Sequence, residues 1–220
     1  MESSLNFFTG FKFQDLLFLG EAAVRTLLIS GISIAAGTVL GVLFGWLLYE
    51  GRIFASATLA PVLDVFRSIP LIIQLVLFYN FAPIIGLSLD PFACGTIVLT
   101  VYTAALAANV ARGGIEAVAI PLRRASRSLG MTYWQDMIYV VAPIGIRAIF
   151  PAWVGVALGV MKDSALVSVL GYIELLKASQ ILITRTQEPF LILAVAGAFY
   201  FALSFPVARF ADRLEQRWSQ

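Results

Sequence analysis

Uncharged stretches divide the chain into long apolar segments separated by short polar ones. Four of these stretches, residues 26–49, 68–89, 91–111 and 189–208, reach or exceed the roughly 20 residues that a helix needs to cross a membrane. A further apolar region, 137–173, contains Arg147 and the adjacent pair Lys162 and Asp163. Its uninterrupted part, 148–161, would rise only about 21 Å as a helix, which is too short to span. A crossing there must carry Lys162 and Asp163 into the bilayer or break near them.

This pattern predicts an all-α integral membrane protein with five transmembrane helices, forming a single domain over residues 1–220. The spans are expected at 22–49, 60–87, 91–114, 143–171 and 189–210, with a cytoplasmic loop at 116–138. Gly37, Gly41 and Gly45 recur along the first span, and small residues at this spacing let helix backbones approach closely. We therefore interpret them as a packing ridge. The chain has no internal repeat of the kind that secondary transporters use, which favours a pathway between two subunits.

The loop between the third and fourth spans carries clear helix signals. Pro121 suits the first turn of a short helix, and Gly130 suits its C-terminal stop. Thr132 and Gln135 have the spacing of a capping box, which predicts that a new helix begins there. This basic and aromatic segment could lie on lipid headgroups or dock into a groove of a partner protein. Its distinctive side chains are Arg123, Arg124, Arg127, Leu129, Met131, Tyr133 and Trp134.

The composition supports a membrane protein and excludes several kinds of chemistry. Apolar residues make up 60% of the chain and charged residues 13%, about half the charged share of ordinary soluble domains. The net charge of +2 gives no sign of a nucleic-acid binder. With no His and with Cys94 as the single cysteine, we expect no metal site and no internal disulfide. The sequence has no Gly-x-x-x-x-Gly-Lys-Ser/Thr loop, so we expect no enzyme activity and no cofactor in this chain.

The positions of Lys and Arg predict the orientation. In a five-span chain, nine of the fifteen basic residues fall on one side of the membrane and four on the other. Basic loops tend to stay in the cytoplasm, so we expect the N-terminus outside and the C-terminus inside. The nine are Arg52, Arg112, Arg123, Arg124, Arg127, Arg147, Arg209, Arg213 and Arg217, and the four are Lys12, Arg25, Lys177 and Arg185.

Polar residues in the second span are candidates for the transport pathway. Arg67, Pro70 and Gln74 stand at i, i+3 and i+7, which is one face of a regular helix. They would form a pathway-facing stripe with Arg67 near the cytoplasmic gate. The alternative is a surface ion pair between Asp64 and Arg67 with a proline kink.

Two further polar groups lie in the third and fourth spans. Tyr102 and Asn109 share a helix face in the third span, where Asn109 either lines a cavity or contacts a neighbouring helix. Lys162 and Asp163 are adjacent and point about 100° apart on a helix, so at least one needs its own partner. They serve either in transport or in an interhelical ion pair that fixes the bundle.

Four motifs along the chain occur in the order and spacing of a known family. Residues 67–75, Arg-Ser-Ile-Pro-Leu-Ile-Ile-Gln-Leu, resemble the family's Arg-Gly-Thr-Pro-Leu-Leu-Val-Gln-Leu, and residues 112–115 match its Arg-Gly-Gly-Ile. Residues 124–126, 129–131 and 140–143 follow the spacing of its Glu-Ala-Ala loop, and residues 162–166 correspond to its Lys-Asp-Thr-Ser-Leu. From about Leu19 to Arg213 the chain resembles the membrane-spanning permease subunit of bacterial polar amino acid ABC importers of type I.

The resemblance implies a type I ABC importer permease fold in the bacterial cytoplasmic (inner) membrane. It implies ATP-driven import of a polar amino acid, a second permease subunit that shares the pathway, and a periplasmic or surface binding protein. Two ATPase subunits would bind ATP and Mg, and the coupling helix of this chain would dock into them. The residues implied in that coupling are Arg123, Arg124, Ala125, Ser126, Arg127, Leu129, Gly130 and Met131.

Two departures from the family pattern bear on the partners and the cargo. Arg124 stands where the family has Glu, which favours a heterodimer with a homologous permease over a homodimer. Asn109 stands where the family commonly has Glu, which argues against a basic amino acid as cargo. The alternative function is an ion-gradient-driven secondary transporter or channel subunit, with Lys162 and Asp163 as an ion relay. A structural membrane scaffold is a third possibility.

Overall fold

The computed structural model describes the backbone of residues 10–218 and the side chains of that range except residues 52–56. Residues 1–9 and 219–220 of the predicted domain, and the Arg52 side chain, lie outside the described residues. The described part contains helices and no strand. In chain order the helices are α1 (Phe13–Glu50), α2 (Arg52–Ser68), α3 (Leu71–Phe81), η2 (Ala82–Ile85), α4 (Pro91–Glu116), α5 (Ile120–Ser128), α6 (Tyr133–Asp136), η3 (Met137–Val141), α7 (Ala142–Asp163), η4 (Ser164–Leu170), α8 (Leu175–Thr186) and α9 (Pro189–Trp218).

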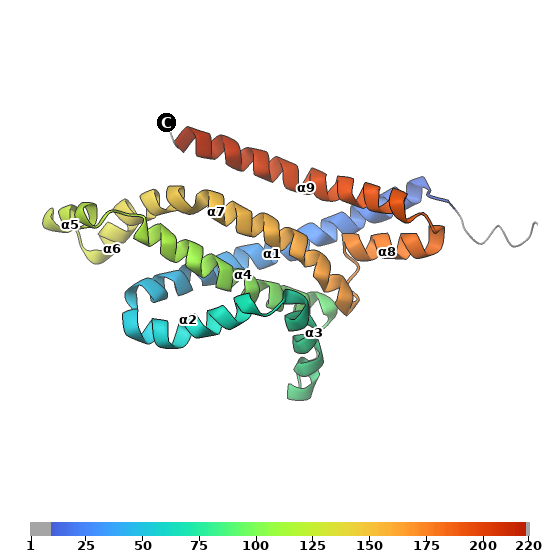
Figure 1. Ribbon diagram of the computed structural model, residues 1–220, viewed down its shortest axis with the longest axis horizontal. Helices are drawn as coiled ribbons and strands as arrows, with labels where there is room; N and C mark the ends of the chain where they lie inside the picture. The colour runs from blue at the N-terminus through green and yellow to red at the C-terminus, as the bar shows by residue number, and fades with distance from the viewer. Residues whose placement is uncertain (1–9, 219–220) are drawn as a thin grey trace, which may run out of the picture.

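The long helices α1, α4, α7 and α9 run roughly along one axis and form an elongated bundle (Figure 1). The short helices α5 and α6 lie at one end of the bundle, which we call the coupling end, and α8 lies at the opposite end (Figure 1). Within the described residues, four helical segments are long and apolar enough to cross a membrane, and the bent pair α2–α3 makes a fifth if counted as one span. The predicted spans 22–49, 91–114, 143–171 and 189–210 fall within α1, α4, α7 with η4, and α9.

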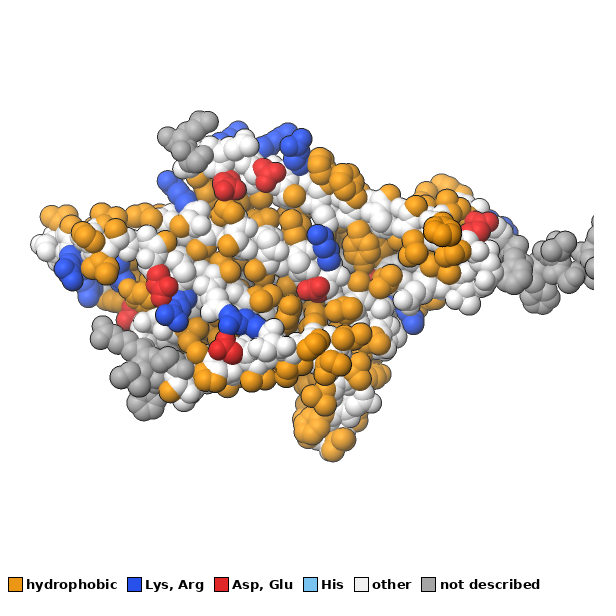
Figure 2. Space-filling view, in the orientation of Figure 1, with side chains coloured by type: hydrophobic (Ala, Val, Ile, Leu, Met, Phe, Trp, Pro, Cys, Tyr) orange, Lys and Arg blue, Asp and Glu red, His pale blue; other side chains and the backbone are white. Residues whose placement is uncertain are grey.

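The predicted span 60–87 corresponds to the bent pair α2–α3 and not to one regular helix. α2 ends at Ser68 and α3 begins at Leu71, with a bend of 103° between the two segments. Ile69 has an extended backbone, with φ −81° and ψ 129°, as expected for a residue that precedes a proline. The bend directs α3 away from the bundle (Figure 1), and apolar side chains cover most of the projecting part in Figure 2.

The fourth span is a continuous helical run that departs from α-helical winding in two places, at η3 and at η4. It starts as α6, passes through the π-helical turn η3, continues as α7 and ends as the 3₁₀ helix η4. The change from α7 to η4 occurs directly after Lys162 and Asp163. The run therefore changes its winding at the charged pair, close to the place where the sequence predicts an interruption.

The glycine ridge of α1 packs closely against α4. A Cβ placed on Gly37 would lie 2.5 Å from the Cβ of Thr103, and one on Gly45 would lie 2.5 Å from the carbonyl oxygen of Ala108. These distances leave no room for a side chain, so the ridge is a packing surface within this chain, as predicted.

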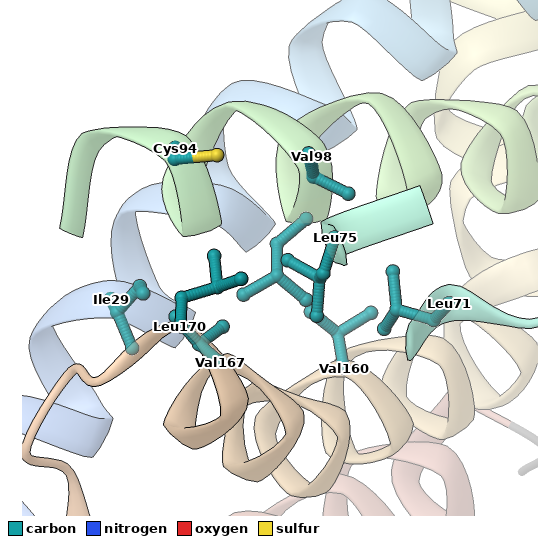
Figure 3. Close-up of a cluster of buried hydrophobic side chains, with 9 residues drawn as sticks. Ile29, Leu71, Leu75, Cys94, Val98, Val160, Val167 and Leu170 are labelled. Carbon is teal, nitrogen blue, oxygen red and sulfur yellow. The ribbon is translucent and has the colours of Figure 1, made fainter. Parts of the chain in front are cut away.

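The largest buried cluster lies where α1, α3, α4, α7 and η4 meet (Figure 3). Leu75 from α3 and Val160 from α7 point toward each other there, and both are fully buried. Cys94 belongs to the same cluster and packs there as a small, fully buried side chain. The cluster attaches the first part of α3 to the bundle, while the outer face of that helix exposes Ile73 and Leu77.

Candidate coupling site and transport pathway

The coupling loop folds as its sequence signals predict. Pro121 lies in the first turn of α5, and Gly130 follows the helix with a φ of +87°, a conformation that favours glycine. The Thr132 hydroxyl accepts from the Gln135 backbone N–H at 3.4 Å, and the Gln135 side chain accepts from the Thr132 N–H at 2.8 Å. The expected order of short helix, glycine turn and new helix is therefore confirmed.

One side of α5 is fixed to the start of the fourth span by a buried carboxylate. Asp136 is 1% exposed and pairs with the Arg123 guanidinium at 3.0 Å. Its other oxygen accepts from the Ser126 hydroxyl at 2.6 Å. Arg123 also donates to the Tyr49 hydroxyl at the end of α1, at 2.7 Å. Three elements thus meet on one ion pair, which holds α5 against the bundle.

Burial acts to lower the pKa of Arg123, but the hydrogen bond to Asp136 and the nearby Tyr49 and Glu50 outweigh it. The net effect raises the pKa above its ordinary value. The guanidinium therefore stays charged, which the buried carboxylate requires.

Aromatic side chains extend this connection to the last turns of α1. The Trp46 indole donates to the Tyr133 hydroxyl at 2.8 Å, and that hydroxyl donates to Glu50 at 2.7 Å. The ring of Trp46 stacks on Trp134 with centroids 5.8 Å apart. We call these residues, together with Tyr49, Arg123, Ser126 and Asp136, the anchor cluster. A displacement of α5 would be transmitted through it to both α1 and the fourth span.

The other predicted coupling residues do not belong to the anchor cluster, although Arg127 contacts one of its members. Arg124, Ala125, Arg127 and Leu129 are exposed, and Leu129 is 83% exposed. Arg127 lies over the Tyr133 ring at 5.7 Å, within the range of a cation–π contact. The eight predicted residues therefore divide into an inward set containing Arg123 and Ser126 and an outward set.

The bend between α2 and α3 is held by Gln74. Pro70 has no N–H, so the carbonyl of Phe66 lacks its usual helical donor. The Gln74 amide nitrogen donates to the carbonyl oxygens of Phe66 and Ile69, both at 2.7 Å. Its oxygen is buried and has no hydrogen-bond partner within the described part of the chain. An apolar cavity of about 580 Å³ lies inside the bend, and Gln74 is among its lining residues.

The bend overturns the premise that Arg67, Pro70 and Gln74 share one helix face. Arg67 lies at the end of α2, Pro70 is in the bend, and Gln74 is in α3. Arg67 is exposed and pairs with Asp64, so the predicted surface ion pair is present. Gln74 is only 8% exposed and is committed to the backbone.

The candidate pathway residues of the third and fourth spans are more exposed to solvent than Gln74. Asn109 and Lys162 are exposed, whereas Tyr102 and Asp163 are partly buried. Tyr102 belongs to α4 and Asp163 ends α7, and these two helices pack against each other. Among the described side chains, which exclude those of residues 52–56, neither Lys162 nor Asp163 forms an ion pair. The predicted interhelical ion pair is therefore absent from this part of the chain.

Several important residues carry no local signal in the sequence. Asp136 and Tyr49 of the anchor cluster were not among the predicted site residues, because their partners are distant in the chain. At the opposite end, Asp15 is buried and pairs with Arg185 after α8 has returned to the start of α1. The one sequence feature that points to Asp136 is that it is a single carboxylate close to three arginines of the loop. Among the described residues, no group of His, Cys, Asp or Glu could hold a metal ion.

The bent second span, the helical loop at one end and the long apolar helices define a membrane-spanning permease subunit. The chain belongs to the family of binding-protein-dependent transport system inner membrane components, whose pattern matches residues 37–220. It is a permease subunit of an ABC importer.

Relatives and a solved structure match over most of the chain. The probable glutamine ABC transporter permease protein GlnM of Bacillus subtilis (strain 168) is 32% identical over 197 residues, which cover 88% of this chain and 89% of the relative. The glutamine transport system permease protein GlnP of Escherichia coli (strain K12) is 27% identical, over 90% of this chain and 91% of the relative. A crystal structure of an amino acid ABC transporter with histidines matches with a TM-score of 0.83 and 26% identity, over 95% of this chain and 100% of that one.

Proposed function

We propose that this permease subunit carries a polar amino acid inward across the cytoplasmic membrane, with the coupling end in the cytoplasm and the N-terminus outside. The distribution of basic residues supports this orientation, because nine of fifteen belong to the side of the coupling loop. The relatives named for glutamine transport support a polar amino acid as cargo. Asn109 in place of an acidic residue argues against a cationic cargo.

The complete importer contains two ATPase subunits, which bind ATP and Mg, a second permease subunit and a binding protein. We assign the pathway to Arg67, Pro70, Gln74, Tyr102, Asn109, Lys162 and Asp163. Within this set, Pro70 and Gln74 shape the bend, while Tyr102 and Asp163 are partly buried on the packed helices α4 and α7. A heterodimer with a homologous permease subunit is our preferred assembly because of Arg124.

The observation that carries the proposal is the anchor cluster. A helix that lies at the end of the bundle and is attached to two spans through a buried ion pair is suited to transmit movement. ATPase closure would displace α5, and the displacement would reach α1 and α7 at the same time.

The test is ATPase stimulation of the reconstituted complex by its binding protein loaded with each of a panel of amino acids. We expect stimulation by glutamine or a similar polar amino acid and little by arginine or lysine. Stimulation only by basic amino acids would contradict the cargo assignment. If the permease chain hydrolysed ATP in the absence of its partners, the assignment of ATP hydrolysis to separate ATPase subunits would be contradicted.

A further inference from the structure

The last part of α9 carries three arginines on one side of the helix. At 100° per residue, Arg209, Arg213 and Arg217 lie within about 80° of one another. All three are exposed, and among the side chains that the structure describes none of them forms an ion pair. We call these three residues the arginine stripe.

The stripe points away from the helix bundle. The packed side of this part of α9 contains Ala211, which is buried, and Trp218, whose ring packs on Phe150 of α7 with centroids 5.1 Å apart. Around the helix, these two residues lie about 160° and 140° from Arg213. The guanidinium groups therefore face the surroundings of the molecule and not its interior.

The acidic residues of the same segment do not cover the stripe. Asp212 and Glu215 lie about 100° and 160° from Arg213 around the helix. Figure 2 shows basic side chains along the edge of this part of α9 that faces away from α7, with acidic side chains closer to the bundle. The positive charge of the stripe is thus left for an external partner.

The position along α9 places the stripe at the edge of the membrane. Residues 189–208 carry no charge and rise about 30 Å as a helix, which equals the thickness of the hydrocarbon core. Arg209 is the first charged residue after this stretch, and Arg213 lies about 6 Å further along the axis. The headgroup layer is about 5–8 Å deep on each side. Two arginines thus fall within it, and the long side chain of Arg217 can reach back to it.

The surroundings of the stripe favour lipid over another protein. In the most apolar stretch of α9, 11% of the residues are buried inside the molecule, against 28% for α1 and 50% for α4. Phe205 and Phe210 flank the stripe and are 44% and 65% exposed. The Arg209 guanidinium lies over the Phe205 ring, 5.5 Å from its centroid. Aromatic and basic side chains together at the end of a span are typical of the membrane–water interface.

We propose that the arginine stripe binds the phosphate groups of anionic phospholipids. The planar guanidinium suits bidentate pairing with phosphate oxygens, and basic residues next to a span attract the negative surface of a membrane. Arg213, in the middle of the stripe, is the central contact. The inference goes beyond the proposed function, because it requires only that α9 crosses the membrane and not a particular cargo or energy source.

The test uses the full-length chain purified with its partner subunits. Native mass spectrometry measures how much phosphatidylglycerol the chain retains in competition with phosphatidylcholine, and the wild type should retain the anionic lipid in preference. Arg213→Gln should weaken phosphatidylglycerol binding by about fivefold, the effect expected for one basic residue near an anionic surface. The triple variant Arg209→Gln, Arg213→Gln, Arg217→Gln should lose the preference. The melting temperature should stay the same, because the stripe faces away from the bundle.

The matched control is Arg112→Gln in α4. It removes the same charge from an exposed arginine that already pairs with Glu116, so it should leave phosphatidylglycerol binding nearly unchanged. Arg213→Lys keeps the charge and should retain most of the binding.

Three results would overturn the inference. The first is equal binding of the two lipids by the wild type, or wild-type binding of phosphatidylglycerol by the triple variant. The second is an equal loss in Arg112→Gln, which would mean that net charge and not the stripe determines lipid binding. The third is a triple variant that binds phosphatidylglycerol normally but loses its ATPase subunits, which would assign the stripe to a protein contact.

Discussion

Single residues determine how the coupling loop is attached to the spans. Arg123 and Ser126 both use Asp136, and Tyr49 adds a contact from α1. Because Asp136 is buried, its charge is stable only with these partners. The carboxylate of Asp136 therefore joins α5 to the start of the fourth span.

We predict that Asp136→Asn lowers the stability of the fold and uncouples the loop. Arg123 would remain partly buried without a counter-charge, which should cost at least about 2 kcal/mol. Thermal unfolding in detergent measures the loss. Glu116→Gln is the control, because it breaks only an exposed pair with Arg112, and it should leave the melting temperature nearly unchanged. Equal effects of the two variants would contradict the role of the anchor cluster.

A second residue-scale prediction concerns the contact between α1 and α4. In Gly45→Ala the new methyl group would meet the Ala108 carbonyl oxygen at 2.5 Å, so the helices must separate. Overpacking of this kind costs about 1–3 kcal/mol, and the melting temperature should fall. Gly31→Ala, in the same helix, meets nothing within 4 Å and should be neutral or slightly stabilising. A Gly45→Ala protein as stable as the wild type would show that the two helices pack less closely than described.

At the scale of elements, the bend between α2 and α3 depends on a side chain that replaces a backbone donor. Gln74→Leu would leave the carbonyls of Phe66 and Ile69 without their shared donor, at about 1–3 kcal/mol for a buried group. We expect a lower melting temperature and slower transport. Adding Pro70→Ala supplies a backbone N–H near Phe66 and should recover part of the stability. If the double variant is less stable than Gln74→Leu alone, the proline is needed for another reason.

The segment before α8 gives a prediction on pH. Glu174 is fully buried and accepts hydrogen bonds from the Leu176 and Lys177 N–H groups at 2.9 and 2.7 Å. Burial raises the pKa of Glu174 more than these bonds lower it. A raised carboxyl pKa means that its stabilising contribution is present at low pH and is lost as the pH rises through the folded-state pKa.

The comparison with Glu174→Gln isolates this effect, since glutamine does not titrate and still accepts a hydrogen bond. The melting temperature of the wild type minus that of the variant should fall as the pH rises above the ordinary value of 4.5. Thermal unfolding over a pH series measures the difference. A difference that grows with pH would mean that the pKa of Glu174 is lowered in the folded state.

At the scale of the whole molecule, much of the fold could be predicted because a membrane imposes simple rules. The length of uncharged stretches indicates spans, and glycine spacing indicates close helix packing. The capping box at Thr132 and the turn at Gly130 are signalled by the local sequence, and the structure contains both. The resemblance carried by four short motifs added the family.

The parts that could not be predicted depend on contacts between distant residues. The pairing of Arg123 with Asp136 spans 13 positions and includes Tyr49, 74 positions away. The position of Pro70 suggested a kink, but a kinked span would still have left Arg67 and Gln74 on similar faces. Only the extended backbone at Ile69 separates them by a bend of 103°. The exposed state of Lys162 likewise depends on which helices cover it.

Taken together, the chain is the membrane-spanning part of an importer whose energy comes from separate ATPase subunits. Its own residues form the bend between α2 and α3, and we propose that they also supply the pathway and the coupling loop. The proposed role of the coupling loop, which is to transmit movement of the ATPase subunits to the spans, requires that ATP hydrolysis and not an ion gradient drives transport.

The most direct test measures uptake of radiolabelled glutamine by vesicles that contain the full complex and binding protein. One set of vesicles receives ATP and Mg on the ATPase side with no ion gradient, and the other receives imposed proton or sodium gradients without ATP. We predict uptake against a concentration gradient in the first set, abolished by Asp136→Asn, and none in the second. Accumulation driven by an ion gradient without ATP would contradict the account.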